Sequence, residues 1–153
     1  MSAITSETRA VEYSLSIEMN APAERVWQSL VDEVDAWWLS DFRVVGPESV
    51  LTLEAKPGGR LYESAPDGTG LLWFTVQQVM PGKGLDLIGH LSPDYGGPAM
   101  TMLSIRLEEE AGVTTVSVRD AISGRVAQEN IASLESGWRW LFTDGWKAHV
   151  EKG

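Results

Sequence analysis

The chain has 153 residues, with 22 acidic against 12 basic residues, a net charge of −10 and no cysteine. A domain of this length buries roughly 68–70% of the surface that its unfolded chain exposes, so it forms a stable core without disulfide bonds. The lack of cysteine excludes disulfides and cysteine metal sites, and the negative charge disfavours nucleic acid and anionic lipid as partners.

The first ten residues are polar and show no periodicity. We expect residues 1–10 to be a flexible lead, followed by a single domain at 11–153. The lead has no apolar run of the signal-peptide kind, and no stretch of the chain approaches the ~20 apolar residues of a membrane span. We therefore expect a cytoplasmic protein without membrane insertion.

A strand and two short helices are predicted next. The period-two alternation of a half-buried strand is set by apolar residues at Tyr13, Leu15, Ile17 and Met19. Asn20 is a good helix N-cap and Pro22 suits the first turn, so we expect a helix that runs to about Asp32. The aromatic segment 32–42 (DEVDAWWLSDF) is predicted to be a shorter helix that closes one end of the domain.

From residue 48 to 120 the sequence reads as about six strands separated by turn residues. We expect these strands at 50–54, 60–64, 71–79, 85–90, 100–108 and 114–121, with an irregular loop at 92–98. Short hairpin connections predict an antiparallel meander. Met100 and Met102 share the face opposite Leu103 and Ile105, which indicates either scattered surface residues or a partner surface, including one for a homodimer.

The last segment, from about 127 to 151, changes to helical period. Its apolar stripe consists of Ile131, Leu134, Trp138, Leu141, Phe142, Gly145 and His149. Only the concave face of the sheet is large enough to cover this stripe. The predicted fold class is therefore α+β: a curved antiparallel sheet of six to seven strands wrapped around a long C-terminal helix, with two short helices after the first strand.

Several short motifs stand in the same order as in a known family. They are residues 21–27 (APAERVW, similar to A-P-x-E-x-V-W), the pair Trp37-Trp38, residues 56–60 (KPGGR), residues 76–85 (V-x-x-V-x-P-x-x-x-L), residues 112–114 (GVT) and 137–141 (G-W-x-x-L). The chain resembles the bacterial homologues of the activator of the heat-shock-protein ATPase, which belong to the START-like superfamily together with polyketide cyclases. The resemblance covers about Val11 to Glu151.

The resemblance implies the helix-grip fold and a small apolar molecule bound between sheet and helix, but no single activity. One position departs from the family, because Gly145 stands where a leucine is usual. The missing side chain is predicted either to admit a neighbouring ring or to widen the cavity.

Seven tryptophans supply much of the expected pocket wall, although the same rings are ordinary core material. The candidate ligand-binding residues are Trp37, Trp38, Tyr62, Trp73, Phe74, His90, Leu103, Trp138, Leu141 and Phe142. Trp73 and Phe74 are neighbours on a strand, so we expect only one of them to line the interior. Arg60, Tyr62 and Asp120 are candidate polar groups, or simply a strand-edge charge, a cross-strand aromatic ring and a turn former.

No catalytic residue, metal site or cofactor is predicted. The two histidines, His90 and His149, lack ligand spacing, and there is no G-x-S-x-G elbow or phosphate-binding loop. We expect binding or sequestration of a lipid- or polyketide-like molecule. The alternatives are a cyclase- or dehydratase-like enzyme and a chaperone or stress-response interaction module.

Overall fold

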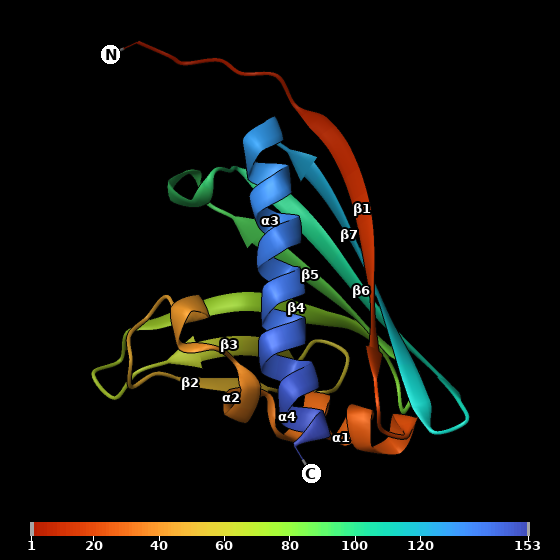
Figure 1. Cartoon of the computed structure of the whole chain (residues 1–153). Helices are drawn as coiled ribbons and strands as arrows, with labels where there is room; N and C mark the ends of the chain where they lie inside the picture. The colour runs from red at the N-terminus through yellow and green to blue at the C-terminus, as the bar shows by residue number, and fades with distance from the viewer. Residues whose placement is uncertain (1, 153) are drawn as a thin grey trace.

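The computed structural model describes residues 2–152, and it consists of one antiparallel sheet curved around a long C-terminal helix (Figure 1). The seven strands lie in the spatial order β1-β7-β6-β5-β4-β3-β2. Their bounds are β1 (Arg9–Met19), β2 (Val50–Leu53), β3 (Arg60–Ser64), β4 (Gly70–Met80), β5 (Gly84–Leu91), β6 (Ala99–Glu110) and β7 (Val113–Gly124). The predicted α+β, helix-grip architecture is confirmed.

The longest pairings join β1, β7 and β6. Strand β1 pairs with β7 from Arg9 opposite Gly124 to Met19 opposite Thr114. The strand therefore includes the last two residues of the expected polar lead. Strands β6 and β7 form a hairpin whose two turn residues, Ala111 and Gly112, both have positive φ angles of 55° and 81°. Such a turn matches the twist of the flanking strands.

Two short helices, α1 (Ala23–Asp32) and α2 (Val34–Trp37), close one end of the sheet, followed by the 3₁₀ turn η1 (Ser40–Phe42) (Figure 1). The predicted cap at Asn20 is wrong, because Pro22 occupies the N-cap position. The backbone N–H of Ala23 instead donates to the Glu109 carboxylate over 2.7 Å. A carboxylate from a neighbouring strand thus satisfies the helix N-terminus.

The C-terminal helix is continuous from Gln128 to Glu151. It comprises α3 (Gln128–Trp140), a π-helical stretch η3 (Leu141–Lys147) and α4 (Ala148–Glu151). The role expected for Gly145 is corrected here. A side chain at this position would lie within 3.0 Å of the backbone carbonyl of Trp37. The glycine therefore admits the end of α2, neither a ring nor extra cavity space.

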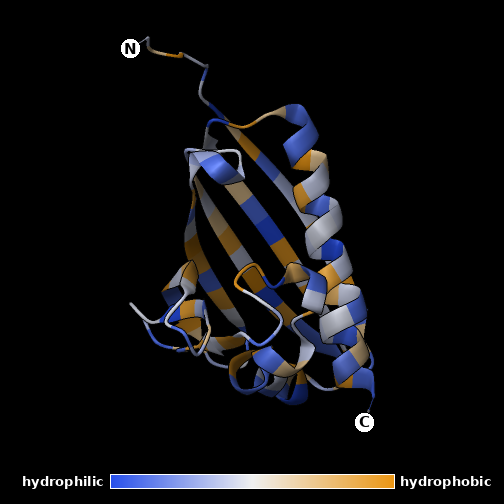
Figure 2. Cartoon of the chain, turned by 90° about the vertical axis from the view of Figure 1, so that its left-hand side faces the viewer, coloured by the Kyte–Doolittle hydropathy of each residue, from blue (hydrophilic) through white to orange (hydrophobic). Residues whose placement is uncertain are grey.

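The strands alternate between hydrophilic and hydrophobic residues, as Figure 2 shows, and the inward residues form two separate cores. The larger core includes Trp37, Phe142 and Trp146 and fills the end of the molecule near α1 and α2. The smaller core consists of Ala99, Ile122 and Val126 and lies where α3 begins. The space between these two cores holds the candidate site.

Candidate functional site

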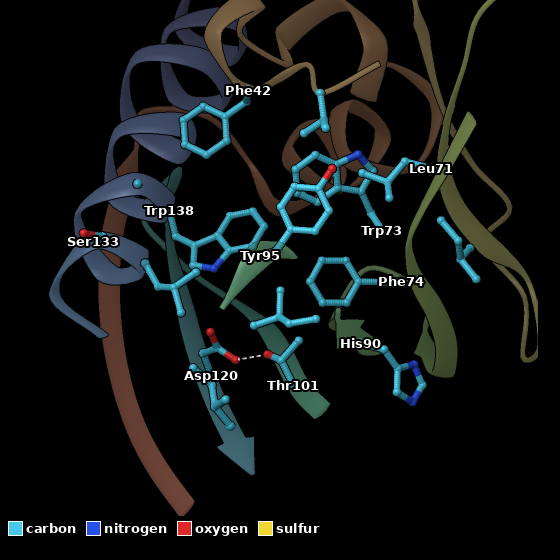
Figure 3. Close-up of a pocket in the computed structure, with 16 residues that line it drawn as sticks. Phe42, Leu71, Trp73, Phe74, His90, Tyr95, Thr101, Asp120, Ser133 and Trp138 are labelled. Carbon is cyan, nitrogen blue, oxygen red and sulfur yellow. Dashed lines mark hydrogen bonds between the residues drawn. The ribbon is translucent and has the colours of Figure 1, made fainter. Parts of the chain in front are cut away.

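A cavity of about 360 Å³ lies between the sheet and α3 (Figure 3). Its wall is mostly apolar and comes from strands β4 to β7, the helix, η1 with the segment after it, and the turn after β5. Leu72 and Tyr95 at its rim are 51% and 54% exposed, whereas Trp138 at its inner end is only 7% exposed. The cavity is therefore open to solvent on one side and closed by an indole ring on the other.

The opening exists because β4 and β5 separate near their ends. They pair only from Thr75 opposite Ile88 to Met80 opposite Gly84. Beyond that point the start of β4 continues beside β3, while the end of β5 continues beside β6. The 3₁₀ turn η2 (Pro93–Tyr95) follows β5 and carries Tyr95 to the cavity.

A β-bulge in β4 corrects the expected orientation of Trp73. Leu61 pairs with Phe74 and Tyr62 pairs with Leu72, so Trp73 is the extra residue between them. A bulge breaks the strict alternation of side chains. As a result both neighbouring rings face inward and contact Trp138, with ring centroids 6.4 Å away for Trp73 and 6.0 Å away for Phe74.

A buried carboxyl group forms the polar part of the cavity wall. Asp120 is 1% exposed and lines the cavity together with Thr101. The hydroxyl of Thr101 donates to one carboxyl oxygen, and the hydroxyl of Tyr13 donates to the other over 2.7 Å. Figure 3 shows Asp120 and Thr101 joined below the indole of Trp138.

Burial raises the pKa of Asp120 above its usual value, although hydrogen bonds from Thr101, Tyr13 and Trp138 act in the opposite direction. Burial also raises the pKa of Tyr13, and the neighbouring Asp120 adds to this shift. The hydroxyl of Tyr13 therefore remains protonated and keeps donating. Asp120 is thus a proton-accepting group inside an otherwise apolar space.

A second buried carboxylate supports the rim. Glu63 accepts hydrogen bonds from the backbone N–H groups of Val44 and Val45, the hydroxyl of Ser49 and the indole of Trp73, over 2.6–3.1 Å. Burial acts to raise the pKa of Glu63, but these hydrogen bonds outweigh it and hold the pKa below its usual value. Glu63 therefore holds the rim residue Val44 and the wall residue Trp73 in place through hydrogen bonds to the same carboxylate.

The structure divides the ten candidate residues into three groups. Trp73, Phe74, His90 and Trp138 line the cavity. Tyr62 lies outside it, with the Arg60 guanidinium 4.5 Å from its ring centroid on the outer face of the sheet. Arg60 and Tyr62 therefore place no polar group in this cavity, and the simpler interpretation of them, a strand-edge charge and a cross-strand aromatic ring, fits their positions.

The remaining five candidates belong to the larger core and not to the cavity: Trp37, Trp38, Leu103, Leu141 and Phe142. The rings of Trp37 and Trp146 stack with centroids 5.3 Å apart and an interplanar angle of 14°. A gap among Trp37, Trp38, Leu103 and Phe142 has a volume of about 20 Å³, which is space for about one water molecule. These residues form a solid floor beneath the cavity.

Sequence reasoning missed Thr101 as a wall residue and considered Asp120 only as a polar alternative. The signal was present in the alternation of the strands. If Val116 and Val118 face inward, then Asp120 faces inward as well. The same rule extends the inward face of β6 from Leu103 back to Thr101. A polar residue at an inward strand position is thus a sign of a site.

The described residues show neither a metal site nor a membrane-spanning helix. No group of three or more His, Cys, Asp or Glu side chains in residues 2–152 is arranged to hold a metal ion. Over the same residues, no helix combines the length and the apolar character needed to cross a membrane.

Solved structures from several organisms share this fold. An uncharacterised protein from Rhizobium leguminosarum matches 97% of this chain and 100% of its own length, with a TM-score of 0.69 and 17% identity. The Aha1 dimer from Colwellia psychrerythraea matches 92% of this chain and 96% of its own, with a TM-score of 0.63 and 19% identity. Ara h 8.0201 matches 95% and 100%, with a TM-score of 0.69 and 11% identity.

No curated protein matches the sequence. A family profile does match, over residues 20–152, which is most of the chain. This range includes α1, six of the seven strands and the whole C-terminal helix. The chain therefore belongs to the family described as Activator of Hsp90 ATPase homolog 1-like protein.

Proposed function

We propose that the protein binds a hydrophobic small molecule in the cavity between the sheet and α3. The observation that carries this proposal is an apolar space of about 360 Å³, open at one side and holding one buried carboxyl group. Ligand sites are typically concave and mainly apolar, with volumes of about 300–1,000 Å³ and a few polar groups that set orientation. A lipid- or polyketide-like molecule has the matching shape and polarity.

The rigidity of the wall supports the same proposal. Trp138 stacks on Phe142 with centroids 5.5 Å apart, and Trp73 is held by its hydrogen bond to Glu63. A wall that is already ordered loses little conformational freedom when a ligand enters. The aromatic faces then offer a flat molecule a large contact area.

Native mass spectrometry of the freshly purified protein tests the proposal directly. We expect a species heavier than the chain that disappears after denaturation. A fluorescence titration with Nile red, a neutral apolar dye, gives the affinity of the emptied protein. Leu134 lines the cavity, so Leu134→Trp fills it and abolishes dye binding. Ala132 is exposed on the same helix, so Ala132→Trp leaves binding unchanged. Equal binding by both variants contradicts the proposal.

Asp120 favours one alternative, an enzyme of the cyclase or dehydratase kind. A carboxyl group with a raised pKa inside an apolar cavity is suited to proton transfer, and such an enzyme also holds its substrate in one reactive shape. If this is the function, the co-purified molecule changes its mass or structure on incubation. Asp120→Asn stops that change while the molecule still binds. A molecule that remains unchanged over many hours rejects the enzyme.

The family membership favours the other alternative, an interaction module for a chaperone or for stress responses. Met100 and Met102 are 40% and 45% exposed on the outer face of the sheet, which supports a partner surface there, including one for a homodimer. Analytical ultracentrifugation of the protein and of Met102→Lys tests the dimer. A monomer at all concentrations contradicts it. Because the chain lacks cysteine, we also propose a reducing, cytoplasmic location.

A further inference from the structure

Away from the rim, the polar side chains in the cavity wall have already used their hydrogens. The hydroxyl of Thr101 donates to Asp120, and the hydroxyl of Ser133 donates to the backbone carbonyl of Glu129 over 3.1 Å. The indole N–H of Trp73 donates to Glu63 over 3.1 Å. What the hydroxyls of Thr101 and Ser133 and the carboxyl group of Asp120 still offer toward the cavity is lone pairs, because hydroxyl and carboxylate oxygens accept more than one hydrogen bond.

Asp120 is the strongest of these acceptors. Its two oxygens receive hydrogens from Thr101, Tyr13 and the indole of Trp138, whereas an ionised carboxyl group has about four acceptor positions, so one position is left for a ligand. Within residues 2–152 no lysine or arginine forms an ion pair with it. Arg9 donates to the backbone carbonyl of Val126 over 2.8 Å, and Arg119 pairs with Glu12 at 3.3 Å.

The remaining donors of the wall lie at its rim. Tyr95 and His90 are both exposed, so solvent already competes for their hydrogens. The polarity of the cavity is therefore asymmetric. The groups at its inner end accept hydrogen bonds, and its outer end is exposed to solvent. The net charge of −10 adds a repulsion for any anion that approaches.

We propose that the ligand of this cavity is an apolar molecule whose buried end carries a hydrogen-bond donor, a hydroxyl or amine group that Asp120 accepts. This inference rests on the proposed ligand-binding function. A ligand that inserts a carboxylate at this end meets the Asp120 charge and finds no free donor. A ligand that ends in an ether leaves Asp120 without its additional hydrogen bond.

Four naphthalene compounds of similar size test the inference on the unmodified protein. They are 2-naphthol, 2-naphthylmethylamine, 2-methoxynaphthalene and 2-naphthoate, each measured by Nile red displacement and by calorimetry. Hydrogen bonds to charged groups change an equilibrium constant by at least about tenfold. We expect the naphthol and the amine to bind about tenfold more tightly than the ether, and the naphthoate to bind most weakly. The ratio of amine to naphthol separates a cationic donor from a neutral one.

A pair of matched variants connects the preference to one side chain. In Asp120→Asn the group loses its charge and one acceptor oxygen, so the tenfold advantage of the amine over the ether disappears, while the ether binds within about twofold of its original affinity. Asp86 lies on the outer face of β5 and pairs with Arg106 over 2.7 Å. Asp86→Asn therefore keeps the full preference.

The outcomes separate this inference from the function on which it rests. If all four compounds bind with equal affinity, or the naphthoate binds best, the cavity is a ligand site but the donor requirement is wrong. If no compound binds and Nile red is not taken up, the ligand-binding function itself fails. A preference for donors that persists in Asp120→Asn also rejects the assignment to Asp120.

Discussion

Two glycines of the C-terminal helix are expected to respond to alanine in opposite ways. Gly137 and Gly145 lie eight residues apart on the face that packs against the rest of the molecule. By intrinsic propensity alone, alanine stabilises a helix by about 0.8–1.0 kcal/mol relative to glycine at either position. The contacts around the two positions differ, and we expect them to decide the sign.

A methyl group at Gly145 would lie within 3.0 Å of the backbone carbonyl of Trp37, which cannot turn aside as a flexible side chain does. Relief requires α2 to move, and this would disturb the stacked pair of Trp37 and Trp146. Overpacking of this kind costs about 1–3 kcal/mol. After the helix-propensity gain of about 0.8–1.0 kcal/mol, Gly145→Ala is expected to destabilise the protein by about 0–2 kcal/mol.

A methyl group at Gly137 meets only the ring edge of Phe42, at 3.4 Å. A few tenths of an ångström of ring movement accommodate it, so Gly137→Ala is expected to stabilise the protein by about 0.5–1 kcal/mol. Urea unfolding followed by tryptophan fluorescence measures both variants. For a chain of this size each kcal/mol also shifts Tm by about 2–4 °C. Equal stability of the two variants, or a more stable Gly145→Ala, would refute the packing argument.

Three further predictions concern buried or paired carboxyl groups. Because the pKa of Asp120 is raised in the native state, its contribution to stability is complete below the unfolded pKa and is lost as pH rises through the folded pKa. Asp120→Asn is therefore expected to gain stability relative to the wild type as pH rises, as measured by urea unfolding. A stability difference between the two proteins that does not change with pH would contradict this. The pKa of Glu33 is lowered to about 2, mainly by its hydrogen bond from Arg25. Glu33→Gln is expected to lower the free energy of unfolding by at most about 1 kcal/mol near neutral pH. This cost shrinks as pH falls from the pKa of Glu33 in the unfolded chain toward 2. Glu63→Gln turns an amide group toward four donors and is expected to cost about 2–3 kcal/mol by denaturant unfolding. Glu54→Gln breaks only a surface ion pair and is expected to leave the unfolding curve almost unchanged. Equal costs for the two variants would contradict the anchoring role of Glu63.

The order of the elements could be predicted from periodicity because each strand and the last helix has one clearly apolar face. The seven strands and the helix from about 127 to 151 follow from that pattern alone. Boundaries moved by only a few residues, as at Arg9, where pairing with Gly124 extends β1 into the polar lead. Local pattern is sufficient where one face is continuously buried.

The cavity could not be located in the same way. The bulge at Trp73 depends on the register between β3 and β4, which no single strand encodes. The separation of β4 from β5 is likewise a property of two strands together. The sequence also could not separate pocket residues from core residues. Large aromatic side chains suit both places, and Trp37 and Phe142 are fully packed in the larger core. An aromatic residue in an apolar pattern predicts a buried position. Only the contacts in the structure show whether free space remains beside its ring.

The position of the cavity follows from two polar residues at inward strand positions. Thr101 and Asp120 stand where apolar side chains would otherwise join the smaller core at Ile122 to the larger core around Trp138. Apolar groups gain nothing by closing onto a carboxyl group that must keep its hydrogen bonds, so the two cores stay apart. The stacked rings on one side are too rigid to fill the gap. The same two residues that interrupt the core thus supply the acceptors that orient a ligand there.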